Sequence, residues 1–212
     1  MRARIVVLSA AWLLALPGWV AAQAQLEGTL SALNVRLTGA VVFLVPAEPT
    51  GAAEALRPPP TSHLIDQVNL RFVPRVLPVL PGSRVQFRNS DPILHNVFGP
   101  AGPGSGFDLG TYPRGERREH TFAEPGAHVI LCHVHPEMVA YVLVIPTPYH
   151  SVVDRDGRFR LQLPAGRYAL HVWHPRTRPY ERPLLVRDGT SIRLEVELEA
   201  ASDRRHAKST RS

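Results

Sequence analysis

The chain has 212 residues, of which 44% are hydrophobic, 7% are aromatic and 21 are prolines. This length suffices for one large or two small domains, and the hydrophobic content is that of a globular protein. The formal net charge is only +6, and the basic C-terminal tail has no interleaved aromatic residues, so nucleic-acid binding is not expected. Many prolines and few aromatic residues favour short strands joined by turns over helices.

The first 24 residues have the pattern of a secretory signal peptide. Two arginines precede an apolar stretch, and Ala22-Gln23-Ala24 offers a small-x-small cleavage signal, with an alternative cut after Ala22. The apolar stretch is shorter than the roughly 20 residues that a membrane-spanning helix needs. We therefore expect a periplasmic or secreted protein with no membrane span after removal of the signal.

Short apolar segments separated by turn residues follow in chain order. Segments 26–31 and 39–46 read as two strands, and segment 48–61, rich in proline and alanine, reads as a linker. Residues 65–74 alternate between apolar and polar side chains and predict a further strand.

A cluster of metal-binding residue types lies between residues 132 and 138. Cys132, the only cysteine, is followed at intervals of three by His135 and Met138. A thiolate, an imidazole and a thioether suit copper, and two histidines, one cysteine and a weak axial methionine make the blue-copper electron-transfer site. Metal ligation also explains a free thiol in an exported protein, because it shields the sulfur from oxidation.

His95 is the best candidate for the second histidine. It follows segment 83–88, which alternates like a strand, and segment 127–131 before the cysteine reads as a strand too. Two strand ends that meet at one pole of a β-sandwich would bring this histidine to the cysteine loop. His133, next to the cysteine, is expected to point away from the metal.

Two motifs resemble the cupredoxins (plastocyanin, pseudoazurin and amicyanin). They are Pro92-Ile93-Leu94-His95-Asn96-Val97 and Cys132-x-x-His135-Pro136-x-Met138, and the second has the spacing of the short ligand loop of amicyanin. The run Phe107-Asp108-Leu109-Gly110, followed by Pro125-Gly126, is similar to a secreted plastocyanin-like subfamily whose members often carry a label referring to methylamine utilisation. The resemblance implies a Greek-key β-sandwich with one type 1 copper per chain, held by His95, Cys132, His135 and Met138.

The same resemblance implies supporting roles for two further residues. The Asn96 side chain would tie the strand of His95 to the cysteine loop. Val134 stands where plastocyanin and amicyanin have a proline, so its backbone N–H is available. We hypothesise that this N–H donates a second hydrogen bond to the Cys132 sulfur and raises the reduction potential. His135 would be the partially exposed ligand through which electrons pass.

The C-terminal strands resemble a second family. Asp154-x-Asp156-Gly157-x-Phe159 and Pro164-x-Gly166-x-Tyr168-x-Leu170 are similar to motifs of the carboxypeptidase-regulatory-like (transthyretin-like) β-sandwich. That module normally opens with two more strands, which residues 26–46 would supply.

An all-β protein with two β-sandwiches is therefore expected. In order, we expect a signal peptide (1–24), a discontinuous regulatory-like sandwich (25–57 and 147–199) around a cupredoxin (58–146), and a disordered tail (200–212). An alternative, in which 25–146 is entirely cupredoxin, stays open.

The expected function is single-electron transfer between redox partner proteins by a monomer that is not an enzyme. The alternative is a copper-binding or delivery protein in which copper is the cargo. Delivery proteins more often have open methionine-rich or histidine-rich tracts, which this sequence lacks.

Overall fold

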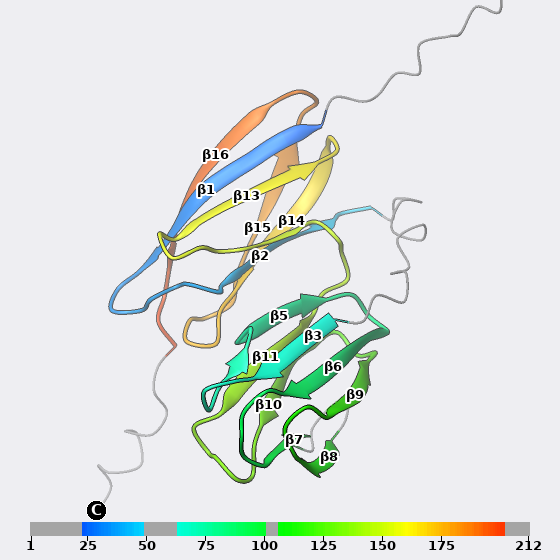
Figure 1. Ribbon diagram of the computed structural model, residues 1–212. Helices are drawn as coiled ribbons and strands as arrows, with labels where there is room; N and C mark the ends of the chain where they lie inside the picture. Colours follow the sequence, from blue (N-terminus) through cyan, green and yellow to red (C-terminus); the bar gives the residue numbers. More distant parts are fainter. Residues whose placement is uncertain (1–22, 49–62, 101–105, 202–212) are drawn as a thin grey trace, which may run out of the picture.

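The computed structural model describes residues 23–48, 63–100 and 106–201, and every regular element in these ranges is a β-strand (Figure 1). The predicted all-β class is confirmed. The strands form four sheets, which pack as two sandwiches that we call the central sandwich and the terminal sandwich. Within the described ranges, no helix is long and apolar enough to cross a membrane.

The central sandwich takes the middle of the chain. Its sheets have the strand orders β5-β11-β10-β7-β8 and β4-β3-β6-β9, with β5 parallel to β11 and β3 parallel to β6. Its strands are β3 (His63–Gln67), β4 (Phe72–Val73), β5 (Val76–Val79), β6 (Ser83–Asn89), β7 (His95–Gly99), β8 (Phe107–Tyr112), β9 (Arg117–Phe122), β10 (Gly126–Leu131) and β11 (Val139–Val144).

The terminal sandwich joins strands from both ends of the chain. Its sheets have the orders β13-β1-β16 and β12-β2-β14-β15. Its strands are β1 (Ala24–Ala32), β2 (Val41–Pro46), β12 (His150–Val152), β13 (Arg158–Leu163), β14 (Gly166–Trp173), β15 (Tyr180–Val186) and β16 (Ser191–Leu198). The chain therefore crosses between the sandwiches twice, once between β2 and β3 and once between β11 and β12.

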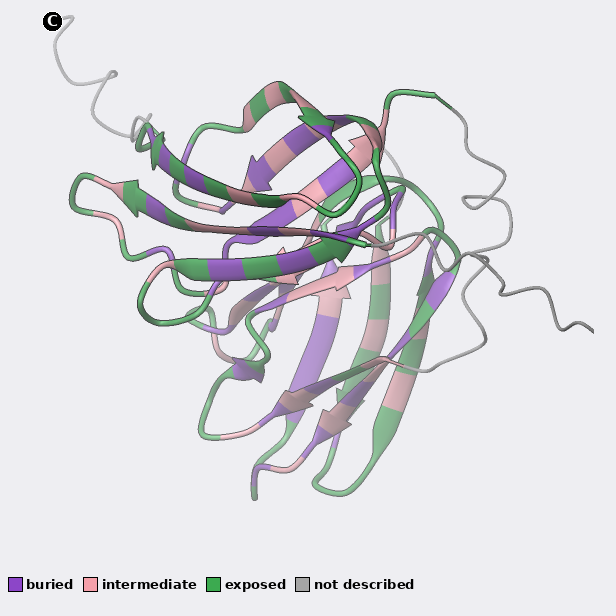
Figure 2. Cartoon of the chain, turned by 90° about the horizontal axis from the view of Figure 1, so that it is seen from above, coloured by how far each residue is buried: buried purple, intermediate pink, exposed green. Residues whose placement is uncertain are grey.

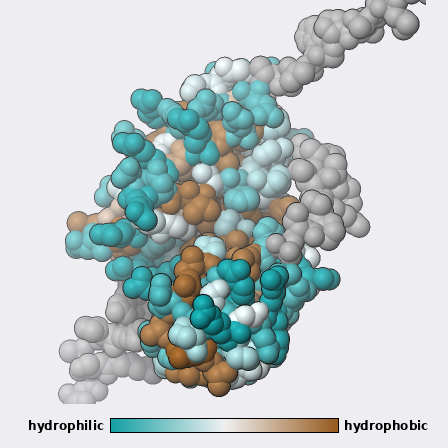
Figure 3. All heavy atoms as spheres, viewed as in Figure 1, coloured by the Kyte–Doolittle hydropathy of each residue, from teal (hydrophilic) through white to brown (hydrophobic). Residues whose placement is uncertain are grey.

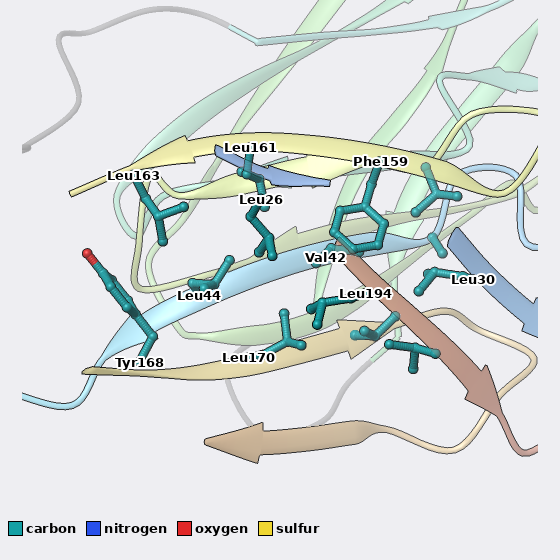
Figure 4. Close-up of a cluster of buried hydrophobic side chains, with 14 of the residues drawn as sticks. Leu26, Leu30, Val42, Leu44, Phe159, Leu161, Leu163, Tyr168, Leu170 and Leu194 are labelled. Carbon is teal, nitrogen blue, oxygen red and sulfur yellow. The ribbon is translucent and has the colours of Figure 1, made fainter. Parts of the chain in front are cut away.

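Alternation of apolar and polar side chains gives several strands of the terminal sandwich one buried face. In β13, Phe159, Leu161 and Leu163 are buried, whereas Arg158 and Arg160 are exposed. The same banding runs along neighbouring strands in Figure 2. Figure 4 shows the buried side chains of the two sheets pointing toward one another across the layer between them. Because side chains alternate across a strand, this pattern fixes which face turns inward.

A third apolar cluster joins the two sandwiches, and we call it the seam. Val41 of β2 packs with Val76 of β5 and Leu143 of β11. The ring of Trp173, at the end of β14, meets that of Tyr141 edge to face, with centroids 5.4 Å apart. The seam removes apolar surface of both sandwiches from water, which stabilises their contact.

Residues 65–74 do not form one strand, so that prediction was wrong. The chain turns back after β3, and β4 pairs antiparallel with it. The backbones of Asn69 and Leu70 are left-handed, with φ of 54° and 57°. A leucine in this conformation is strained. The apolar alternation continues through the turn, so the pattern alone cannot reveal it.

The ends of the chain differ in part from the prediction. Residues 1–22 of the expected signal peptide and 202–212 of the expected tail lie outside the described residues. Ala24 is the first residue of β1 and is buried, so a cut after Ala22 would leave that strand whole, whereas a cut after Ala24 would shorten it. Ala200 bridges to Thr177 and the Ala201 N–H bonds to the Arg176 carbonyl, so order extends two residues beyond the predicted start of the tail.

Candidate metal centre

The candidate ligands lie at one pole of the central sandwich. His95 opens β7, and Cys132 directly follows β10. These strands are neighbours in the same sheet, with Leu131 opposite Phe98. Strand pairing thus brings together two residues that are far apart in the sequence.

Three donor groups converge at this pole. His95, Cys132 and His135 each offer a ligand atom, and these atoms all lie within 4.8 Å of one another. The Nδ1 atom of His95 is 3.1 Å from Nδ1 of His135 and 4.0 Å from Sγ of Cys132. Ligand atoms bound about 2.0–2.3 Å from one metal ion are expected at such separations. Within the described ranges, this is the one group of three or more histidine, cysteine or acidic residues with such spacing.

The loop after Cys132 enters the apolar core again at Met138. Its side chain is buried in the same apolar cluster as Cys132. Its backbone N–H donates to the carbonyl of His135 at 2.9 Å, which closes a tight turn over Pro136. The turn therefore places the methionine and the second histidine on the same short loop with little freedom to separate.

The two histidines differ in their access to solvent. His95 is fully buried, while His135 is half-buried at the edge of the site. Their rings meet edge to face with centroids 4.8 Å apart. Only His135 of the two can therefore touch a molecule outside the protein.

Asp91 is a supporting residue that the sequence did not reveal. Its Oδ2 atom lies 2.8 Å from Nε2 of His95, on the far side of the ring from Cys132. A carboxylate there accepts a hydrogen bond from Nε2–H, which leaves the lone pair of Nδ1 free for a metal. The only signal in the sequence is an acidic residue four positions before the histidine, which is too common to single out.

Asp91 is itself firmly held. Its carboxylate accepts the backbone N–H groups of Asn69 at 2.6 Å and Leu70 at 2.9 Å, the two strained residues of the β3–β4 turn. Burial alone would raise the pKa of Asp91, but the N–H of Leu70, the His95 ring and the N–H of Asn69 lower it below its ordinary 3.8. The carboxylate thus links the turn to the buried histidine.

The loop after the cysteine is also tied to β7. The side-chain Oδ1 atom of Asn96 accepts the backbone N–H of His133 at 3.4 Å. The ring of His133 is exposed and stacks on Phe98, with centroids 3.6 Å apart. Among the described residues, the contact recorded for the Cys132 sulfur is His95, so the hydrogen bond predicted from the Val134 N–H is not seen.

Comparison with solved structures finds copper proteins. The chain is similar to a purple cupredoxin from Nitrosopumilus maritimus, at 26% identity over 39% of this chain and 99% of that chain, with a TM-score of 0.35. It is also similar to a reduced Cu(I) form of an amicyanin variant, at 24% identity over 49% of this chain and 98% of the other, with a TM-score of 0.38.

A copper-containing nitrite reductase from Thermus scotoductus SA-01 is similar over a smaller share of its length. The identity is 24%, the match spans 55% of this chain and 28% of that one, and the TM-score is 0.38. No protein-family model matches the chain, and the comparison with curated proteins gives no match.

Proposed function

We propose that this chain is a type 1 copper protein that carries single electrons between redox partners. The observation that carries the proposal is the convergence of the Cys132 sulfur with Nδ1 of His95 and Nδ1 of His135. Two imidazoles and a thiolate, with a methionine nearby, are the donor set of blue-copper centres. One such group supports one copper ion per chain.

The chemistry of the donors favours copper over other metals. A soft thiolate and a thioether suit copper, whereas carboxylate and carbonyl oxygens suit magnesium or calcium. Zinc also binds histidine and cysteine, but its structural sites have four strong ligands and do not use methionine. His95, Cys132 and His135 would hold the ion, and Met138 would contribute a weak thioether contact. When bound, copper supplies a one-electron redox couple.

Contacts within the protein hold the donor set in place. Asp91 orients His95, and Asn96 holds the backbone next to Cys132. Met138 packs in the core. Donors that cannot move far change little between the two oxidation states of the ion, which supports rapid electron exchange.

Electrons would pass through the edge of His135. Apolar side chains on the surrounding loops are exposed, namely Leu70, Ile93, Leu94 and Val134. In Figure 3, hydrophobic residues gather at the lower end of the molecule, where these loops of the central sandwich lie. An exposed apolar patch of this kind suits a partner protein that docks transiently. We therefore propose a redox partner protein as the contact, with the chain acting as a monomer in the periplasm and not as an enzyme.

The visible absorption spectrum of the copper-loaded, oxidised protein, starting at Gln23, tests this function. We expect an intense thiolate-to-copper band that disappears on reduction and is absent in Cys132→Ser. The zinc-loaded protein serves as the control for metal binding without colour. A weak band, with copper that a chelator removes readily, would reject the electron carrier and favour the alternative, a protein whose cargo is copper.

A further inference from the structure

A second pair of metal-binding side chains lies on the surface beside the proposed copper centre. His133 directly follows Cys132, and Asp108 lies on β8. The imidazole Nε2 atom is 3.6 Å from the carboxylate Oδ2 atom, and both side chains are more than half exposed, at 59% and 54%. This separation is too long for a hydrogen bond. It is the separation expected of two ligands about 2.0–2.2 Å from one ion.

Both side chains are already held in place. The ring of His133 lies flat on Phe98, with an angle of 7° between the ring planes. The Oδ1 atom of Asp108 accepts the Asn96 amide N–H at 2.7 Å and the Gly110 backbone N–H at 2.8 Å, which leaves Oδ2 directed to the imidazole. These hydrogen bonds, that of the Gly110 N–H first, lower the pKa of Asp108 below its ordinary 3.8, so the carboxylate is charged at neutral pH.

Asn96 connects the pair to the proposed copper ligands. Its side-chain Nδ2–H group donates to Asp108, and its side-chain Oδ1 atom accepts the backbone N–H of His133. The residue before Asn96 is the buried ligand His95, and the residue before His133 is Cys132. The exposed pair is therefore built on the same two strand ends as the buried donors.

We propose that His133 and Asp108 form an exposed binding site for a divalent first-row transition metal ion, and that this site captures copper on its way to the buried donors. An imidazole nitrogen and a carboxylate oxygen are both ligands for such ions, and Cu²⁺ binds such sites more tightly than Ni²⁺ or Zn²⁺ do. Water would complete the coordination, so the ion would be held weakly and released easily.

The capture role rests on the proposed function and follows from burial. His95 is fully buried and Cys132 is 3% exposed, so of the three donors only the half-buried His135 can meet an incoming ion at the surface. His133 is the next residue in the chain after Cys132, so the two sites share one loop. Transfer is a ligand exchange without a change in oxidation state: the imidazole and carboxylate leave the Cu²⁺ ion, and the Cys132 thiol gives its proton to solvent as the thiolate binds.

Electron paramagnetic resonance during a Cu²⁺ titration tests the binding site. After the first equivalent has filled the thiolate centre, we expect a second equivalent to give a separate Cu(II) signal of the ordinary tetragonal kind. His133→Phe keeps a ring on Phe98 but removes the ligand nitrogen, and Asp108→Asn keeps an oxygen for the Gly110 N–H. Each substitution should lower the affinity for the second equivalent of Cu²⁺ at least tenfold.

The matched control is His120→Phe. His120 also stacks on a phenylalanine, Phe107, at 3.9 Å, but no carboxylate lies against it in the described residues. This variant should bind the second equivalent like the wild type. A second equivalent that is absent from the wild type, or that His133→Phe and Asp108→Asn leave unchanged, would overturn the site.

The rate of copper loading tests the capture role separately. In stopped-flow mixing of the metal-free protein with Cu²⁺, the thiolate-to-copper band should appear at least five times more slowly in His133→Phe and Asp108→Asn than in His120→Phe. Equal rates would reject capture. If no intense band forms in the wild type, the proposed function fails, yet the separate Cu(II) signal and its loss in the variants still decide the surface site.

Discussion

The Nε2 atom of His95 lies 2.8 Å from Oδ2 of Asp91, while the other ring nitrogen, Nδ1, faces Cys132. A carboxylate at Nε2 favours the tautomer whose Nδ1 lone pair is free, and Asp91 also connects the candidate metal centre to the strained turn at Asn69 and Leu70. The geometry of the buried histidine thus depends on a loop that contributes no ligand.

Asp91→Asn should lower copper affinity about 10–100-fold, because the amide cannot accept the His95 proton as a carboxylate does. Chelator competition measures the affinity. Asp66→Asn is the control, since Asp66 bonds to Arg88 and Ser90 and not to a candidate ligand. Equal affinities in the two variants would contradict the role given to Asp91.

Tyr112→Phe should reduce the free energy of unfolding by about 1–3 kcal/mol. The buried hydroxyl accepts the Gln67 side-chain N–H at 2.6 Å and donates to the Phe87 carbonyl at 3.1 Å, so its removal leaves two buried polar groups without this partner. Urea unfolding measures the change. In Tyr149→Phe, where no hydrogen bond of the hydroxyl is recorded among the described residues, the loss should stay below about 0.5 kcal/mol.

Leu143→Ala should destabilise the chain by about 2–5 kcal/mol, because it empties part of the seam. Calorimetry should show one unfolding transition in the wild type and two in this variant, as the sandwiches lose their contact. Leu185→Ala, at a leucine that is 55% exposed, should change stability by less than about 0.5 kcal/mol. A single transition in the seam variant would show that the sandwiches do not depend on this contact.

Stability of the metal-free protein should fall as the pH drops from about 7.5 to about 5.5. Burial lowers the pKa of His150 and of His174 below the ordinary 6.5. Folding therefore favours the neutral rings. The stability that they contribute is complete above about pH 7.5 and declines as the pH falls through about 6.5, because the unfolded chain binds protons more readily there. Urea unfolding across this range should show a shallower pH dependence in His150→Gln, and an unchanged slope would refute the assignment.

Local spacing explains why some of these features could be predicted from the sequence. Cys132, His135 and Met138 lie within one short loop, so their interval already indicates a shared site. The all-β class follows from alternation in segments such as β13. The ligand roles of these residues remain predictions that the spectrum will decide.

Contacts between distant residues explain what the sequence did not show. Asp91 acquires its role from backbone groups 21 and 22 positions earlier, and Asp108 meets His133 only because β7 and β8 pair beside the cysteine loop. The turn at Asn69 and Leu70 was missed because a leucine with positive φ has no signature in an alternating segment. Alternation of apolar and polar residues identifies strands. Which strands pair, and which loops are joined by hydrogen bonds, depends on the assembled fold.

The chain passes between the sandwiches twice, and the seam fills the contact between them. The candidate metal centre is therefore not expected to rotate freely relative to the terminal sandwich. Cleaving either connection would leave the halves covalently joined by the other. A linker attached at one chosen site of the terminal sandwich would therefore hold the candidate metal centre at a defined distance from that site. On the proposed function, an electrode joined to that linker would exchange electrons with every molecule over the same distance.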